Sequence, residues 1–457
     1  MTGKRLCLAL CGGALLLAGL PARALECSTG GFAGLQGAVS TVRDASLNPD
    51  GDFSKEQEKT ALYSDVSADC ATAEFKFHLN AYGERIESYG DAGSAQQREG
   101  YDTRGFIREA YVSLSPNESW FIDIGKKDIR NGQFFFVSPL DFLQNPGNYA
   151  SRGVVDALGI SARDTYREGS IAAQASWFSP TGTLELAVIP QLAEASARPR
   201  IANWSTLQRT NGQERYYAAY TTSLFEDFNP RFVLVGGERF GAGLGTSGFL
   251  TEDLILNFEL AASDQSDVHP VSRGALRKLQ TGQLPSADEV FVEQERDVFY
   301  QFAAGLRYAT ENNLALSMEY LFQDQGMDKD ERNTYFDTLA ITERAYQASG
   351  AEIFRGYQLL FVQEADNTLR RDLMLGRQYL MSHVQRDKPD LRTLSWETSA
   401  IYNIEDRSYA LNLHLSSQLS RHFELYFGGG YLDGPDRSEF GRLGTSGVGY
   451  AGVRAIW

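Results

Sequence analysis

Outside its first twenty residues, the sequence lacks any long apolar stretch. After Leu20 no run of eighteen apolar residues occurs, and the mean hydropathy is -0.32, which excludes a bundle of transmembrane helices. Proline is scarce, at 13 residues, whereas glycine (44 residues) and aromatic residues (12%) are plentiful. This composition favours an all-β chain in which each strand is only half apolar.

Positive charge is also in short supply. Lys and Arg number 43 against 59 Asp and Glu, so the net charge is -16. A surface of this kind repels nucleic acid and anionic lipid headgroups, and we therefore expect no nucleic acid partner. Anionic solutes could still enter where basic residues line their path.

Residues 1–24 have the pattern of a signal peptide. Lys4 and Arg5 precede an apolar stretch from Leu6 to Leu20, and the small residues up to Ala24 resemble a cleavage site. The apolar stretch is short for a membrane anchor and no stop-transfer flank follows it, so we expect cleavage after Ala24 and export. Loss of this leader removes three positive charges and no acid, which moves the net charge to -19.

Only two of the four cysteines remain after this cleavage, Cys27 and Cys70. A single pair in an oxidising compartment favours a disulfide. Lipidation of Cys27 is the alternative, but Leu25 and Glu26 match poorly to the small residues that precede a lipoprotein cysteine. We prefer the disulfide.

Apolar and polar residues alternate over stretches of about ten residues, which indicates β-strands with one apolar face. In 411–419, for example, leucines at alternate positions form one face and polar residues form the other. The same pattern recurs at 75–81, 300–308 and 314–323. Several apolar faces end in an aromatic ring, such as Trp120 and Trp396, which suits a lipid–water boundary.

Short and long connections alternate loosely between these strands. The short ones include 115–119, 179–183 and 310–313, and the long acidic ones are 263–294 and 323–371. Short turns on one side and long loops on the other are typical of outer-membrane barrels, and a bilayer requires the sheet to close. We predict an all-β fold, a transmembrane antiparallel β-barrel of about 16–18 strands over residues 25–457, with 31–41 and 356–362 as marginal strands.

One segment departs from the strand pattern. Thr338 to Leu360 has apolar residues near helical spacing, which predicts a helix inside the long loop 323–371. This helix would either fold into the lumen, as a plug or constriction, or lie exposed to solvent. Both interpretations stay open.

The final strand also resembles a family feature. Ala451, Val453, Ala455 and Trp457 share one face of an alternating strand, with Arg454 on the other. A last strand that closes on an aromatic residue resembles the assembly signal of bacterial outer-membrane β-barrels. The resemblance implies recognition of Trp457 by the barrel-assembly machinery and pairing of this strand with the first one, near Phe32–Val42.

The segment from Trp120 to Phe142 carries a second resemblance. Gly125-Lys126-Lys127, Asn131-Gly132 and Ser138-Pro139-Leu140-Asp141 resemble the strand end and following loop of porin-like barrels of the alginate-export type. The resemblance implies a transport barrel with a constriction loop that contains Lys126, Lys127, Arg130 and Asp141. A rim of salt bridges to Asp123, Asp128 and Asp141 is the alternative role for the three basic residues.

Charged residues on the polar strand faces should line the pore and influence what passes. By alternation these are Lys76, Glu259, Arg307, Glu319, Arg377, Glu397, Glu424 and Arg454. Their mixed signs predict either facing ladders or internal ion pairs, and do not support a strongly charge-selective filter.

Two motifs resemble other kinds of site. The segment 46–57 resembles a calcium loop, but Ser46 and Gln57 stand where acidic ligands belong, so we interpret it as a turn. Asn412, His414 and Ser416 share a strand face, and outer-membrane phospholipases use these residue types. Positions two apart on a strand are about 6.6 Å apart, too far for a nucleophile and its base. We expect no enzymatic activity, no metal and no cofactor.

The sequence therefore predicts a porin in the outer membrane of a Gram-negative bacterium, which lets small hydrophilic solutes diffuse passively. Its partners would be the lipid bilayer, lipopolysaccharide, the barrel-assembly machinery and a small solute or polysaccharide. Export of an alginate-like exopolysaccharide and a structural or adhesive barrel with a plugged lumen are the alternatives.

Overall fold

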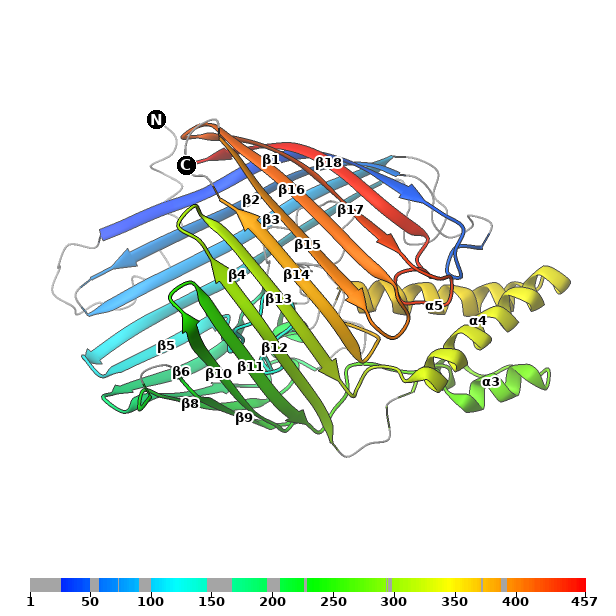
Figure 1. The fold of residues 1–457 in the computed structure, drawn as a ribbon, viewed down its shortest axis with the longest axis horizontal. Coiled ribbons are helices and arrows are strands. Elements are labelled where there is room, and N and C mark those ends of the chain that lie inside the picture. The colour runs from blue at the N-terminus through cyan, green and yellow to red at the C-terminus, as the bar shows by residue number, and fades with distance from the viewer. Residues whose placement is uncertain are drawn as a thin grey trace.

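A single antiparallel sheet of eighteen strands accounts for most of the described chain (Figure 1). The computed structural model describes residues 26–49, 57–72, 74–89, 100–145, 167–194, 206–225, 228–292, 294, 298–370, 373–387 and 393–457. Each strand pairs with its neighbours in the chain, and β1 also pairs with β18. The sheet is thus a closed barrel, which confirms the predicted fold at the upper end of the expected strand range.

The eighteen strands of the described residues have these bounds: β1 (Glu26–Val42), β2 (Gln57–Ala71), β3 (Phe75–Tyr89), β4 (Gly100–Asn117), β5 (Trp120–Lys127), β6 (Ser170–Ser179), β7 (Gly182–Ile189), β8 (Arg215–Thr222), β9 (Arg231–Gly237), β10 (Gly241–Thr251), β11 (Leu254–Ser263), β12 (Phe299–Ala309), β13 (Leu314–Gln323), β14 (Gln378–Arg386), β15 (Leu394–Asn403), β16 (Tyr409–Ser420), β17 (Phe423–Asp433) and β18 (Thr445–Ile456).

The barrel closes where the two ends of the chain meet. Phe32 of β1 lies opposite Ile456 of β18, and the pairing continues to Thr41. Trp457 adds two backbone hydrogen bonds with Gly31, with N···O distances of 3.1 and 3.2 Å. The predicted pairing of the first and last strands is confirmed, and 31–41 is a regular part of β1.

The two faces of the wall differ in polarity as the alternation predicts. On β16, Leu411 and Leu413 are each 43% exposed on the outside, whereas Asn412 between them is 8% exposed on the inside. Many other Leu, Val, Phe and Tyr side chains on the outer face are exposed in the same way. In water such a continuous apolar surface would be unfavourable, whereas against lipid it is the expected one.

The two ends of the barrel differ in the length of their connections. The predicted short connections near 115–119, 179–183 and 310–313 are turns between β4 and β5, β6 and β7, and β12 and β13. Glu26, the first described residue, and the C-terminal Trp457 lie at this short-turn end (Figure 1). The opposite, long-loop end carries the helices and the longer connections between strands.

Helices occur in the long connections of the described chain: α2 (Thr206–Thr210), α3 (Arg273–Gln280), the 3₁₀ helix η3 (Ala287–Glu289), α4 (Lys329–Ser349) and α5 (Glu352–Arg370). None of them is long and apolar enough to cross a membrane. In Figure 1, α3 and α4 project from the long-loop end, and α5 runs back toward the strand ends. Buried side chains of α4 and α5, among them Tyr335 and Phe361, pack in one cluster with Leu321 and Tyr379 of the wall.

The helix expected at 338–360 is present, but it is divided into α4 and α5 at Gly350, whose φ of 64° ends α4. The expected strand at 356–362 is wrong, because this segment lies inside α5. Its apolar residues pack against α4, and the rings of Phe361 and Tyr335 lie 4.8 Å apart.

The expected cysteine pair lies across two neighbouring strands. Cys27 of β1 is directly opposite Cys70 of β2, and the structure joins them in a disulfide. The bond lies at the short-turn end, next to the seam where the barrel closes.

Candidate functional site

The chain leaves the wall after β5 and folds into the barrel. Residues 128–145, here called the inward loop, reach across to β11 and β13 on another part of the wall. Glu259 of β11 accepts hydrogen bonds from Gln133 N (2.8 Å), Leu140 N (3.3 Å) and the Ser138 hydroxyl. Glu319 of β13 accepts from the backbone nitrogens of Phe135 (2.7 Å) and Phe136 (3.1 Å). Two carboxylates therefore hold the loop by five hydrogen bonds.

Glycines on the inner wall make room for the apolar side chains of the loop. A Cβ atom at Gly243 or Gly245 of β10 would collide with the methyl groups of Leu140, which is fully buried. A Cβ at Gly305 of β12 would likewise meet the ring of Phe134. Because these contacts need bare backbone, the glycines seat the loop on the wall and supplement its polar anchors.

The inward loop borders two cavities that lie along the barrel axis. Strand β12 shows their order, since Gln301 near the long-loop end lines one and Arg307 near the short-turn end lines the other. The long-loop cavity has a volume of about 590 Å³ and is bordered by Asp141 and Phe142 of the loop. The short-turn cavity has about 420 Å³ and is bordered by 133–135. The loop thus narrows the lumen between two vestibules.

Four of the predicted pore-lining residues lie at this constriction or beside it. Glu259 and Glu319 are buried anchors of the inward loop rather than freely exposed pore charges. Arg307 and Glu397 line the short-turn vestibule. The Oε1 atom of Glu397 lies 2.9 Å from Nε2 of His383, whose ring stacks on Phe135 of the loop at 3.7 Å.

Three more of these residues lie elsewhere on the inner wall. Arg454 and Glu424 form a buried ion pair at 3.5 Å, and the Arg454 guanidinium lies 4.5 Å from the centre of the Phe32 ring. This pair braces the wall near the closing seam, as the internal ion-pair interpretation expects. Lys76 is exposed near the beginning of β3, at the short-turn end.

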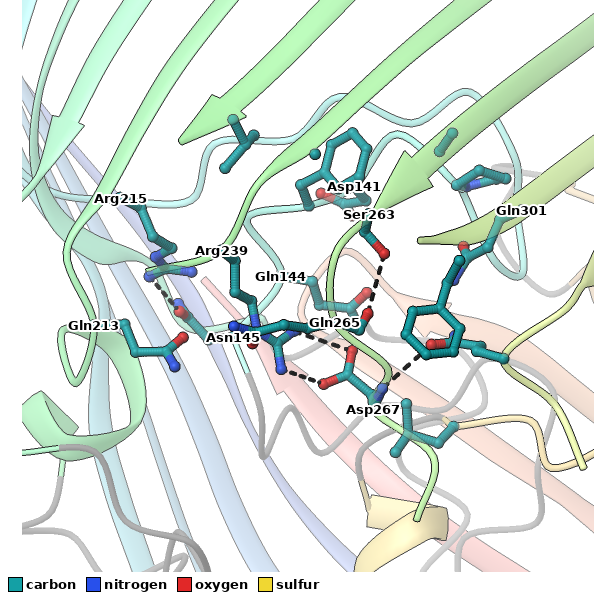
Figure 2. Close-up of a pocket in the computed structure, with 18 of the residues that line it drawn as sticks. Asp141, Gln144, Asn145, Gln213, Arg215, Arg239, Ser263, Gln265, Asp267 and Gln301 are labelled. Atoms are coloured by element: carbon teal, nitrogen blue, oxygen red, sulfur yellow. Dashed lines mark hydrogen bonds and ion pairs between the residues drawn. The ribbon is translucent and has the colours of Figure 1, made fainter. Parts of the chain in front are cut away.

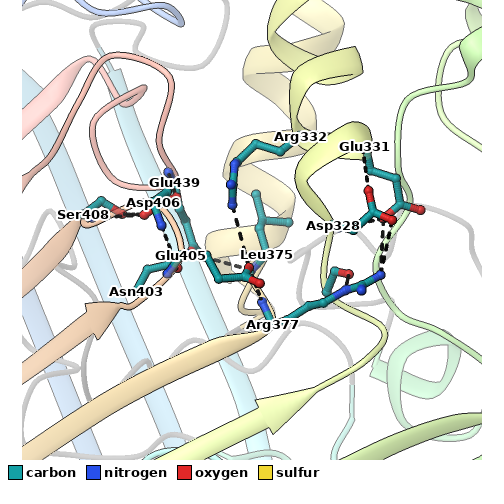
Figure 3. Close-up of polar contacts among 12 residues, drawn as sticks. Asp328, Glu331, Arg332, Leu375, Arg377, Asn403, Glu405, Asp406, Ser408 and Glu439 are labelled. Carbon is teal, nitrogen blue, oxygen red and sulfur yellow. Dashed lines mark hydrogen bonds and ion pairs between the residues drawn. The ribbon is translucent and has the colours of Figure 1, made fainter.

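Arg377, which was predicted to line the pore, contacts the segment at the beginning of α4. This residue precedes β14, so the alternation of a strand does not determine its direction. Its guanidinium donates to Gly326 O at 2.9 Å and lies 3.6 Å from Asp328 and 3.9 Å from Glu331 (Figure 3). Arg377 therefore ties the strand end to the beginning of α4.

The basic residues predicted for the constriction loop are paired with acids. Lys127 contacts Asp123, and Arg130 lies 2.5 Å from Asp128, as the salt-bridge interpretation expects. Lys126 is buried and lies 2.6 Å from Glu168. Asp141 borders the long-loop vestibule and contacts Arg167. Among the described residues, these ion pairs leave no concentrated positive charge at the narrow part of the lumen.

Further polar contacts hold the helices at the long-loop end (Figure 3). Arg332 of α4 lies 3.7 Å from Glu405. Glu439 accepts hydrogen bonds from Leu375 N and Asn403 Nδ2, both at 2.9 Å. Burial raises the pKa of the Glu439 carboxyl above its ordinary value, even though these hydrogen bonds oppose the shift.

The two motifs that resemble a hydrolase site and a calcium loop lie in surroundings that suit a structural role. His414 packs between Tyr426 and Tyr450 and lies 2.9 Å from the Tyr450 hydroxyl, which suits a role in the wall. Asn48 is buried and donates to Arg43 O at 3.0 Å, within a local turn. Residues 50–56 of the calcium-like segment lie outside the described residues.

Sequence reasoning missed several residues that shape the site. His383 and Gln301 lie on the inner faces of β14 and β12, and the alternation contained the signal for both. Glu168 and Arg167 follow a stretch of the chain that carries no strand pattern, and no local signal connects them to Lys126 and Asp141. The ion pairs Lys126–Glu168 and Arg167–Asp141 join segments about 26 to 42 positions apart, so only the folded chain brings their partners together.

The fold defines the class of this protein, a closed eighteen-stranded barrel with an inward loop. No protein-family profile and no curated protein sequence matches the chain. Among solved structures it is similar to OccAB1 of Acinetobacter baumannii, with a TM-score of 0.50, 9% identity, and coverage of 94% of this chain and 96% of that chain. OccK7 (OpdD) of Pseudomonas aeruginosa gives 0.49 and 9%, with 94% and 99% covered. At this identity the likeness shows the fold, a porin-like barrel, and it does not support the alginate-export resemblance.

Proposed function

We propose that the protein is an outer-membrane porin through which small hydrophilic solutes diffuse passively. The observation that carries this proposal is the inward loop, which narrows a polar lumen between two vestibules instead of filling it. A narrow polar passage stabilises hydrated solutes and limits their size, and it needs no energy source.

The outer surface of the barrel supports a location in the outer membrane of a Gram-negative bacterium. Its exposed Leu, Val and aromatic side chains match the apolar band that such barrels present to lipid. The same proposal includes removal of residues 1–24 as a signal peptide, assembly through the last strand by the barrel-assembly machinery, and contact with lipopolysaccharide at the long-loop end.

Export of an anionic exopolysaccharide fits the lumen less well. A negatively charged polymer would need unpaired Arg and Lys along its narrowest passage. Here Lys127 at the end of β5 and Arg130 of the loop are paired with acids, and the two loop anchors are carboxylates. The loop also crosses the lumen, which would obstruct a continuous chain.

A plugged structural barrel and an enzyme also fit less well. The helices α4 and α5, which were candidates for a plug, pack at the long-loop end in one apolar cluster with inner-wall residues such as Leu321 and Tyr379, and their described residues line neither vestibule (Figure 1). His414 is enclosed by tyrosines rather than by a nucleophile and a substrate cavity. The remaining lumen is therefore best explained as a path for solutes.

Planar-bilayer recording of the purified, refolded protein tests the proposal. We expect open, ohmic channels with weak charge selectivity, because most charges beside the constriction are paired. A variant that lacks 335–365 should also conduct; conductance that appears only after this deletion would favour the plugged barrel instead. A correctly folded barrel that conducts in neither form would overturn the porin function.

A further inference from the structure

The long-loop vestibule is lined mainly by uncharged hydrogen-bonding groups. It is about 590 Å³ in volume, within the range of about 300–1,000 Å³ that is common for small-molecule sites. Carboxamides come from the inward loop, from the chain before β8 and from β12, and Figure 2 shows Gln144, Gln213 and Gln301 around the same space. The cavity is therefore assembled from both the loop and the wall.

Three of these carboxamides have no hydrogen-bond partner for their side chains within the described residues. They are Gln144, Gln213 and Gln301, which are exposed or partly exposed toward the cavity. Each carboxamide offers two N–H donors and one oxygen acceptor. A solute that carries several hydroxyl groups can donate to the oxygens and accept from the N–H groups at the same time.

The charged residues of this vestibule are occupied by the protein itself. Arg239 lies 2.9 Å from Asp267, and Arg209 lies 2.9 Å from Glu168 (the first pair is drawn in Figure 2). Asp141 contacts Arg167. The vestibule thus offers an entering ion little net charge to bind.

Arg215 is the one cation lining this cavity for which the described residues provide no acid. Its side chain is buried, and its terminal nitrogens donate to Thr210 O (2.7 Å), Ser170 Oγ (2.9 Å) and Asn145 Oδ1 (3.0 Å). These contacts occupy its terminal nitrogens, while Nε has no partner among the described residues. An anionic solute would also meet Asp141 and Asp267 in the same cavity.

Apolar rings complete the lining. Phe142 of the inward loop and Phe240 before β10 both border the cavity. Aromatic rings pack well against the C–H faces of sugar rings, while hydroxyl groups at the sugar edge reach polar partners. The short-turn vestibule differs in charge, because it is lined by Glu397 and by Arg307, which is exposed.

We propose that the long-loop vestibule is a binding subsite for a neutral saccharide of one or two rings. This inference rests on the proposed porin function and specifies the solute class that the channel takes up. Donor and acceptor carboxamides, neutralised charges and aromatic rings all suit a polyhydroxylated neutral solute better than an ion.

Single-channel recording with maltose as the probe tests this subsite. We expect maltose to reduce the current in a saturable way. The double variant Gln144→Leu/Gln301→Leu keeps side-chain volume but removes two carboxamides, so it should raise the half-saturating maltose concentration about tenfold. Gln385→Leu is the matched control, since Gln385 lines the short-turn vestibule. It should leave maltose binding unchanged.

A binding measurement separates this inference from the porin function. Saturation-transfer NMR of the detergent-solubilised protein detects maltose without requiring conductance. Maltose binding that is weakened by Gln144→Leu/Gln301→Leu supports the subsite even if no channel conducts, in which case only the porin function fails. Absence of binding, or equal binding by the double variant, overturns the subsite. Gluconate or glucosamine binding as tightly as maltose overturns its assignment to neutral solutes.

Discussion

Release of the inward loop from its two carboxylate anchors should widen the channel. In Glu319→Leu, the backbone N–H groups of Phe135 and Phe136 lose their acceptor. In Glu259→Leu/Glu319→Leu the loop loses all five hydrogen bonds to these carboxylates. Leucine retains most of the side-chain volume, so the wall itself should change little.

The expected size of the effect follows from these contacts. Hydrogen bonds to a charged group contribute about 1.5–3 kcal/mol each. Water in the vestibules can solvate the released N–H groups, so the lower value applies. Two bonds then give about 3 kcal/mol for Glu319→Leu, or roughly a hundredfold loss of preference for the anchored loop. Five bonds give about 7.5 kcal/mol for the double variant, enough to release the loop.

Single-channel conductance and liposome swelling with a tetrasaccharide measure this release. Glu319→Leu should add current fluctuations, and the double variant should show higher conductance and faster entry of the tetrasaccharide. Glu397→Leu is the control, because it also removes a lumen carboxylate but makes no hydrogen bond to the loop backbone. A folded double variant with the conductance of the wild type would refute the role of these anchors.

Three further outcomes are expected. Deletion of Trp457 removes two hydrogen bonds to Gly31 at the closing seam, so it should lower the heat-modifiable, assembled fraction in outer membranes; normal insertion would contradict this. Cys27→Ala/Cys70→Ala opens a link between residues 43 positions apart, which should cost up to about 4 kcal/mol and lower the temperature at which the folded band converts on gels. The raised pKa of Glu439 favours its neutral form, so stability of the long-loop end should fall as pH rises above the ordinary value of 4.5. Limited proteolysis should show this trend in the wild type, and a persisting trend in Glu439→Gln would argue against it.

The wall of the barrel was predictable from local pattern because successive strand residues face opposite sides. The leucines of β16 and the polar residues between them lie as the alternation predicts. The rule does not apply to Arg377, which lies just outside β14. It failed at 356–362, where a short apolar run is compatible with strand or helix. In the structure this run is helical and packs against α4, a contact that the local sequence pattern does not reveal.

The candidate site was predictable only in part. The sequence identified 125–141 as a constriction loop and placed Glu259 and Glu319 on the inner wall. It did not connect them, because their partners in the loop lie between 119 and 184 positions away in the chain. Lys126 shows the same limit, since its acid is Glu168 rather than a nearby Asp.

The sequence by itself determined that this chain forms a barrel with an apolar outside, a polar inside and a last strand paired with the first. These properties follow from the period of the strand and from the need to pair every backbone group in a bilayer. Only the tertiary structure decided that the inward loop divides the lumen, which charges cancel, and which carboxamides remain available to a solute. Those properties depend on contacts between distant segments, and the path of a loop across a lumen leaves no periodic signal in the sequence.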